Sequence, residues 1–526
     1  MTARRSLVRA GLVVTSAFLL SRVLGWVRVV VIGTTFGASR DLDAFFAAFR
    51  IPDLIFQLVA AGALASALIP VLAGLLATGQ PSRAWRVAST VTNLMLIALV
   101  VGSAVLFLAA PAIVPLITPG FEQAALDKTV ELTRVMLLSP ILLALGSVAT
   151  SILNAQDRFA AAAMAPVAYN LAIIGAAVLL APSMGVDALA VGVVAGSLLH
   201  VLVQLRSLHA SGFRYRPAID AADPEAREAF VLMAPRAVGL GVTQLTFVVS
   251  TSLASGLAVG SITAFNVAFT ILQIPIGVIG VPLGVVVFPS LSRDLARGAT
   301  DEFLHLLTQS LRLLLFVMLP LTALASVVRM QLVTILFGYG LFGGSAIELT
   351  ADTLLFFLVG LAAHSLIAVL ARAFYAGRDT RTPVAAAILA VVVNVTLAFA
   401  LVGPMGLPGL ALAIAVGAWV EALVLVEILR RRYPALDGRG IAMVFVKSAV
   451  ASVAAGLAGL GTLHVATAAL GAEVGKVGLV IELAAVTLVG GLVFVAAAAA
   501  LRIPELPTIV AVVLDLLRRP RRPRAS

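Results

Sequence analysis

Two long apolar stretches near the start of the sequence contain charged residues that could bind an anion. Arg22 and Arg28 lie in the first stretch, and Asp43, Arg50 and Asp53 lie in the second. A guanidinium presents a fork of N–H donors that matches phosphate oxygens, and a charge at bilayer depth costs roughly 2.5–3.5 kcal/mol unless it faces a partner or a cavity. We expect Arg28 to face a substrate cavity. For Arg22, Arg50 and Asp53, ion pairing of the two arginines with Asp43 and Asp53, or contact with the membrane interface, is an equal alternative to substrate binding.

No pattern in the sequence predicts catalysis. The absence of cysteine excludes disulfides and thiolate chemistry, and the five histidines show no metal-ligand spacing. The segment from Gly471 to Lys476 is one residue too short for a phosphate-binding loop, and Val477 replaces the required serine or threonine. We therefore predict that the protein is not an enzyme, is not an ATP-driven pump, and has no metal or cofactor.

The composition predicts a membrane protein. Of the 526 residues, 61% are hydrophobic and 12% are charged, which is more apolar surface than a soluble chain could bury. Apolar runs of about 20 residues match a hydrocarbon core about 30 Å thick and are too long for barrel strands. We expect an all-α polytopic fold of about fourteen transmembrane helices, at 10–34, 44–77, 87–117, 131–154, 163–182, 185–206, 230–257, 262–291, 305–328, 351–374, 383–402, 407–430, 443–466 and 477–501.

Basic residues are unevenly distributed between the two sides that such helices would define. With a cytoplasmic N-terminus, most connecting-loop arginines fall on the cytoplasmic side, among them Arg83, Arg86, Arg158, Arg206, Arg293, Arg297, Arg378, Arg381 and Arg430 to Arg432. This follows the positive-inside rule and predicts that both termini are cytoplasmic. Topology and attraction to membrane lipids then explain the net charge of +11, and we expect no nucleic-acid partner.

The sequence also repeats itself at an offset of roughly 220 residues, or six spans. Ala155-Gln156-Asp157-Arg158 matches Ala376-Gly377-Arg378-Asp379, and Ile51-Pro52 matches Ile274-Pro275. Parallel repeats are typical of two lobes with a substrate cavity between them, although chance similarity of apolar sequence is the alternative. We expect an N-terminal lobe (1–215), a C-terminal lobe (216–435), an added helical pair (436–505) and a basic cytoplasmic tail (506–526).

Proline and glycine interrupt several of the expected helices. Gly25, Pro52 and Pro275 are our candidate hinges, because such breaks permit the bending that a transporter requires. Kinks without any function are the alternative.

The N-terminal motifs resemble those of a known family. The motifs are Ser21-Arg22-Val23-Leu24-Gly25-Trp26-Val27-Arg28, Asp43-Ala44-Phe45-Phe46, Arg50-Ile51-Pro52 and Ile69-Pro70. They are similar to the signature of the MurJ (MviN) lipid II flippase family, and further matches extend over most of the chain. The resemblance implies the fold of the MOP superfamily, with fourteen helices and two six-helix lobes. It also implies transport of undecaprenyl-pyrophosphate-linked peptidoglycan precursor across the bacterial cytoplasmic membrane, for peptidoglycan biosynthesis and cell shape.

The match to the family pattern is incomplete at the residues implied to bind the head group. Arg22, Arg28 and Asp43 agree with the pattern, whereas Asp53 stands where asparagine is frequent. Charged positions of the family are occupied here by Val29, Phe56, Ala61, Thr270 and Gln273. Arg236 could compensate. These departures leave the identity of the head group open.

We therefore predict an alternating-access flippase for lipid II, with Arg28 and Arg22 attracting the pyrophosphate. The alternatives are a flippase for another polyprenyl-linked glycan, a multidrug exporter of the same superfamily, and a non-transporting scaffold that recruits cell-wall synthesis proteins. The membrane potential, worth about 2.3 kcal/mol per charge per 100 mV, could drive export of the anion, and the resemblance adds coupling to a monovalent cation as an alternative. We expect a monomer, because a two-lobe transporter needs no second copy.

Overall fold

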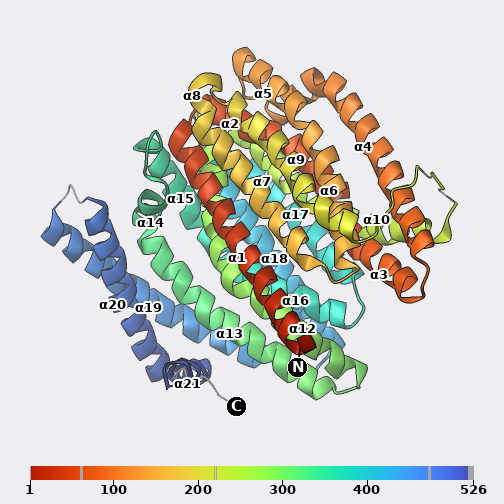
Figure 1. The fold of residues 1–526 in the computed structure, drawn as a ribbon. Helices are drawn as coiled ribbons and strands as arrows, with labels where there is room; N and C mark the ends of the chain where they lie inside the picture. The colour runs from red at the N-terminus through yellow and green to blue at the C-terminus, as the bar shows by residue number, and fades with distance from the viewer. Residues whose placement is uncertain (1, 60–62, 218, 221, 472–474, 519–526) are drawn as a thin grey trace. The chain divides into compact units, whose positions relative to one another are not determined.

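The computed structural model describes residues 2–59, 63–217, 219–220, 222–471 and 475–518. Within these residues, side chains are described for all but 2–15, 18, 59, 63–66, 232, 234–239 and 512–518. Every regular element in this part of the chain is helical, as Figure 1 shows. The prediction of an all-α fold is confirmed.

The first half of the chain forms helices α1 to α10. They are α1 (Thr2–Phe36), α2 (Arg40–Val59), α3 (Ala63–Ala77), α4 (Pro81–Ile117), α5 (Gln123–Met136), α6 (Leu138–Asn154), α7 (Phe159–Leu179), α8 (Ala181–Met184), α9 (Asp187–Ala210) and α10 (Pro224–Ser255). The second half continues with α11 (Ser261–Pro275), the π-helical turn η1 (Ile276–Gly280), α12 (Val281–Ala296), α13 (Thr300–Val327), α14 (Arg329–Phe337), α15 (Ser345–Val359), α16 (Leu361–Ala376), α17 (Arg381–Met405), α18 (Leu407–Arg432), α19 (Gly438–Leu470), α20 (Lys476–Ala500) and α21 (Glu505–Arg518).

Each apolar run predicted to cross the membrane coincides with a helix or with consecutive helices. By length and composition, 11 helices of the described chain could span a membrane, or 12 if the bent pair α15 and α16 forms one span. The exact count of fourteen is therefore not confirmed. The run at 44–77 fails this test because it divides into α2, which contains five charged residues and Pro52, and the short α3.

The helices form two compact units. Unit 1 comprises Met1–Val267 and Phe337–Ala346, and unit 2 comprises Ala268–Leu336 and Ile347–Ser526. In unit 1, α2 packs against α5 and α10, and α1 packs along α7. The division into lobes at residues 215 and 435 remains a prediction.

The repeated sequence motif folds into the same turn in each unit. After α6, the N–H groups of Asp157 and Arg158 donate to Asn154 and Leu153, and Asp157 has a φ of 57°. After α16, the N–H groups of Arg378 and Asp379 donate to Tyr375 and Phe374, and Arg378 has a φ of 58°. Both helices thus end with a left-handed residue whose neighbours satisfy the terminal carbonyls, which explains why the two sequences match.

The three candidate hinges lie inside or at the end of helices. Gly25 lies within α1 and Pro52 within α2, while Pro275 ends α11 and is followed directly by the π-helical turn Ile276–Gly280. π-helical turns interrupt the regular ladder of hydrogen bonds and are frequent at functional sites. A hinge role for the three residues remains a prediction.

Candidate functional site

The Asp43 carboxylate holds α2 against the start of α11. Its Oδ2 accepts from the backbone N–H of Gly260 at 2.7 Å, and its Oδ1 accepts from the N–H and the hydroxyl of Thr263, each at 2.8 Å. Asp43 is only 1% exposed. The first N–H groups of a helix have no partner within it, and a carboxylate is favoured there by the helix dipole. Asp43 therefore caps α11 from another helix.

Glycines explain why α11 takes its cap from elsewhere. Gly260, directly before α11, has a φ of +88°, and a Cβ on it would lie 2.6 Å from the Ala38 carbonyl oxygen. This position excludes a side chain, so it cannot supply the usual capping serine or aspartate. Gly37 has a φ of +64°, and a Cβ there would lie 2.7 Å from the Leu341 carbonyl oxygen. We call the contact of Gly37, Asp43, Gly260 and Thr263 the capped junction.

Arg50 lies about two turns further along α2 and is held by neutral partners. Its Nε donates to the Thr251 hydroxyl at 3.0 Å, and its Nη2 donates to the Asn266 side-chain oxygen at 2.7 Å. The guanidinium also lies over the ring of Phe247, 5.3 Å from its centre. These contacts fix the orientation of Arg50 without neutralising its charge.

Asp53 is placed between two arginines. Its Oδ2 accepts from the Gln244 amide at 2.9 Å, and it interacts electrostatically with both Arg50 and Arg28. Arg28 is partly exposed and lies over the ring of Tyr169 on α7, 5.8 Å from its centre. The structure thus brings together Arg28, Arg50 and Asp53, which we call the charged cluster.

Arg22 is exposed on α1, and Arg236 belongs to α10 but its side chain lies outside the described ones. Substrate binding by these two residues, and by the members of the charged cluster, remains a prediction. Asp43 belongs to the capped junction, where both of its carboxylate oxygens are occupied by helix-capping hydrogen bonds.

The residues that depart from the family pattern lie in both units of the structure. Phe56 packs against a core cluster of unit 1, and Val29 is partly buried on α1. Thr270 and Gln273 belong to unit 2, and Ala61 lies outside the described residues. The positive charge predicted to attract the substrate comes from Arg22 and Arg28 on α1 and from Arg50 on α2, among the described side chains of unit 1.

Sequence reasoning missed the partners that orient these charges. They are Tyr169, Gln244, Phe247, Thr251, Asn266 and Thr263. A usable signal did exist, because Gln244, Thr251 and Asn266 are polar residues within apolar helices, where a polar group must find a hydrogen-bond partner. Their pairing with Arg50 and Asp53 could not be predicted, since the partners are about 200 residues apart in the sequence.

Comparison with known proteins shows the family. The family model described as lipid II flippase MurJ matches residues 32–477. The chain belongs to the MurJ family. A protein named lipid II flippase MurJ from Burkholderia cenocepacia is 33% identical over 435 residues, covering 81% of this chain and 84% of the relative. A probable lipid II flippase MurJ from Rhizobium tropici is also 33% identical and covers 85% of this chain and 86% of the relative.

Solved structures show the same fold. A lipid II flippase MurJ in an inward closed conformation superposes with a TM-score of 0.77 at 21% identity, covering 93% of this chain and 98% of that one. An inward-facing multidrug resistance transporter of the MATE family, from the MOP superfamily, superposes with a TM-score of 0.69 at 17% identity, covering 79% and 95% of the two chains. This member of the MurJ family is thus a multi-pass membrane protein with an all-α fold like that of these solved structures.

Proposed function

We propose that this chain is a flippase that moves lipid II from the inner to the outer leaflet of the bacterial cytoplasmic membrane. The observation that carries the proposal is membership of the MurJ family, supported by 33% identity to a lipid II flippase over 81% of the chain. The proposed activity is transport without a chemical reaction, so the protein is not an enzyme.

The charged cluster suits the pyrophosphate of such a substrate. Arg28 and Arg50 contribute two positive charges against the one carboxylate of Asp53, and the hydrogen-bond partners of Arg50 are neutral. A guanidinium that is already oriented loses little entropy when it binds phosphate oxygens. Arg28 is the principal pyrophosphate ligand in this proposal, because it is partly exposed and its guanidinium lies over the ring of Tyr169.

Movement between inward- and outward-open states would require α2 and α11 to change their relative position. The capped junction fastens these helices through a single carboxylate, which can release three donors at once. Bending at Gly25, Pro52 and Pro275 would accommodate the change, and the π-helical turn after Pro275 supports that assignment. In this proposal, the capped junction is formed in one of the two states and released in the other.

The membrane potential is the proposed driving force. A potential that is negative inside favours export of an anion by about 2.3 kcal/mol per charge per 100 mV if the charge crosses the whole field. The arginine distribution predicts that both termini are cytoplasmic. Coupling to a monovalent cation is the alternative, and the protein is expected to act as a monomer that can associate with cell-wall synthesis proteins.

Complementation tests the function. The endogenous lipid II flippase of a bacterial host is depleted, this chain is expressed, and growth and lipid II in the outer leaflet are measured. Rescue supports the proposal. Failure with the protein present in the membrane contradicts it.

Transport of another polyprenyl-linked glycan is the second candidate, and Phe56 and Thr270 favour it. They replace charged residues of the family pattern, so fewer polar groups are available to recognise the sugars. This candidate predicts that vesicles containing the purified chain translocate a different polyprenyl-pyrophosphate glycan faster than lipid II.

A further inference from the structure

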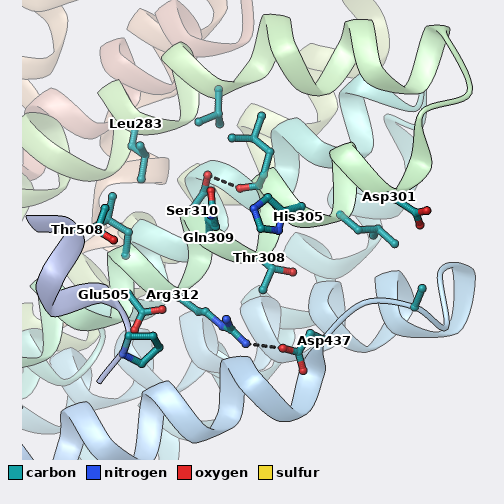
Figure 2. Close-up of a pocket in the computed structure, with 16 residues that line it drawn as sticks. Leu283, Asp301, His305, Thr308, Gln309, Ser310, Arg312, Asp437, Glu505 and Thr508 are labelled. Atoms are coloured by element: carbon teal, nitrogen blue, oxygen red, sulfur yellow. Dashed lines mark hydrogen bonds and ion pairs between the residues drawn. The ribbon is translucent and has the colours of Figure 1, made fainter. Parts of the chain in front are cut away.

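Unit 2 contains a cavity of about 570 Å³ that is distinct from the charged cluster. It is bordered by α12, α13, the turn between α18 and α19, and the start of α21, as Figure 2 shows. Its volume lies within the roughly 300–1,000 Å³ that small-ligand sites occupy. One wall is apolar, with Leu283, Val287 and Leu304, whereas the opposite side presents charged and hydroxyl groups.

Two buried polar atoms of opposite charge line this cavity without a hydrogen-bond partner among the described residues. One is Nε of Arg312, and the other is Oε2 of Glu505. The two side chains interact electrostatically, and the remaining donors of Arg312 include one that is paired with Asp437. Buried polar atoms normally have partners, because leaving one unpaired costs roughly 1–3 kcal/mol. Other atoms of both side chains are accessible, because the Arg312 side chain is 21% exposed and Glu505 is partly exposed, so a ligand in the cavity can accept from Arg312 and donate to Glu505.

Both side chains are held in place by the surrounding helices. Asp437 caps α19 by accepting from the Gly440 N–H at 2.7 Å, so the partner of Arg312 is fixed. Leu506 and Ile509 of α21 pack against a core cluster that includes Phe316 and Phe494, which anchors Glu505 at the cavity. Burial raises the pKa of the Glu505 carboxyl, so its ionised form gains from a cationic neighbour.

The cavity lies where membrane-spanning helices of unit 2 begin and end. Helix α13 begins at Thr300 and α19 at Gly438, while α20 ends at Ala500 just before α21. Arg297 and Arg432 also lie at helix ends here, on the side that the arginine distribution predicts to be cytoplasmic. The cavity is therefore at the depth of the inner-leaflet head groups, where phospholipid phosphates and amines are the most abundant ligands.

The head group that fits is a zwitterion. Asp301, Asp437 and Glu505 outnumber Arg312 among the lining acidic and arginine residues, so an anion alone would meet net repulsion. A primary ammonium donates hydrogen bonds, whereas a choline ammonium cannot. We propose that this cavity binds an aminophospholipid of the inner leaflet, with Arg312 donating to its phosphate, Glu505 accepting from its primary ammonium, and the apolar wall contacting the start of its acyl chains.

Equilibrium binding of radiolabelled phosphatidylethanolamine to the purified full-length protein in detergent tests this proposal. Phosphatidylcholine and phosphatidylglycerol are the comparison lipids, and soluble phosphoethanolamine is the competitor. Wild-type protein should bind phosphatidylethanolamine about tenfold more tightly than either comparison lipid. Glu505→Gln, which keeps size and removes the charge, should abolish this preference. Glu302→Gln removes a charge from the exposed first turn of α13 outside the cavity and should leave binding unchanged.

Equal binding of the three lipids by the wild-type protein, or an unchanged preference in a folded Glu505→Gln protein, would overturn the proposal. Competition by soluble phosphoethanolamine at the concentration of the lipid would also overturn it, because the ligand would then be a free zwitterion. If Glu505→Gln does not fold, Thr508→Trp fills the cavity from an exposed position on α21 and should lower phosphatidylethanolamine binding about tenfold. Unchanged binding by Thr508→Trp would contradict the site. None of these outcomes depends on whether the chain flips lipid II.

Discussion

Oδ1 of Asp43 accepts two hydrogen bonds from Thr263, one from its backbone N–H and one from its hydroxyl, each at 2.8 Å. The other carboxylate oxygen accepts from Gly260, a residue that cannot bear a side chain because Ala38 approaches it so closely. An aspartate on one helix thus replaces the capping side chain that another helix lacks. This contact fastens the first turn of α2 to the start of α11. Arg50 of the charged cluster lies about two turns further along α2.

Replacing Asp43 should destabilise the protein. In Asp43→Ala, three buried donors lose their acceptor, which costs roughly 1–3 kcal/mol for each unsatisfied group before relaxation. The apparent unfolding temperature of the purified protein in detergent should fall clearly. Asp41→Asn is the matched control, because Asp41 lies two residues earlier on α2 and is exposed. Equal unfolding temperatures for Asp43→Ala and Asp41→Asn would show that the capped junction contributes nothing.

Arg50 should not be replaceable by lysine. Lysine keeps the charge but cannot donate in a fork to Thr251 and Asn266 or stack on Phe247 in the same way. Losing one oriented hydrogen bond, at about 1.4 kcal/mol, corresponds to roughly tenfold weaker binding of the transported anion. The initial rate of lipid II translocation in vesicles at limiting substrate should fall by that factor. Arg86→Lys changes an exposed arginine of α4 and should translocate at the wild-type rate. A normal rate for Arg50→Lys would exclude an oriented guanidinium there.

Stability at low pH should depend on Asp379, which lies two residues before the start of α17 at Arg381. Burial opposes ionisation of this carboxyl, but hydrogen bonds from Thr382 and Arg432 prevail and lower its pKa to about 2. Because the folded-state pKa lies below the ordinary value of about 3.9, the ionised group stabilises the fold above that pH, and the contribution is lost as pH falls toward 2. Wild-type protein should unfold at a higher temperature than Asp379→Asn at pH 7, and the difference should shrink by pH 2.5.

Asp157→Asn serves as the control for this pH experiment. Asp157 lies at the corresponding turn after α6, is exposed, and has no ion pair within the described chain. The difference in unfolding temperature between Asp157→Asn and wild type should be small and should not change with pH. The lowered pKa of Asp379 would be contradicted if the difference in unfolding temperature between wild type and Asp379→Asn stays constant from pH 7 to 2.5.

The helices were predictable from the sequence because apolar runs of membrane length leave the backbone few alternatives. The turns after α6 and α16 were visible as a repeat, since similar short polar segments follow both helices, and each contains one left-handed residue, Asp157 or Arg378. The charges themselves were equally visible, because Arg28, Arg50 and Asp53 interrupt apolar sequence. The sequence could not show which residues on different helices form hydrogen bonds with one another. The cap on α11 joins residues 217 and 220 positions apart, and Arg50 meets partners 201 and 216 positions away. Such contacts depend on how helices pack.

Translocation of lipid II by purified protein in vesicles tests the central claim most directly. Labelled lipid II is incorporated on one leaflet, a potential is imposed, and its appearance on the other leaflet is followed for wild type, Arg28→Ala and the control Arg86→Ala. The account predicts translocation by wild type and Arg86→Ala, and loss of at least about tenfold for Arg28→Ala, because its guanidinium attracts the pyrophosphate. Translocation by Arg28→Ala at the wild-type rate, or none by correctly inserted wild type, would contradict it.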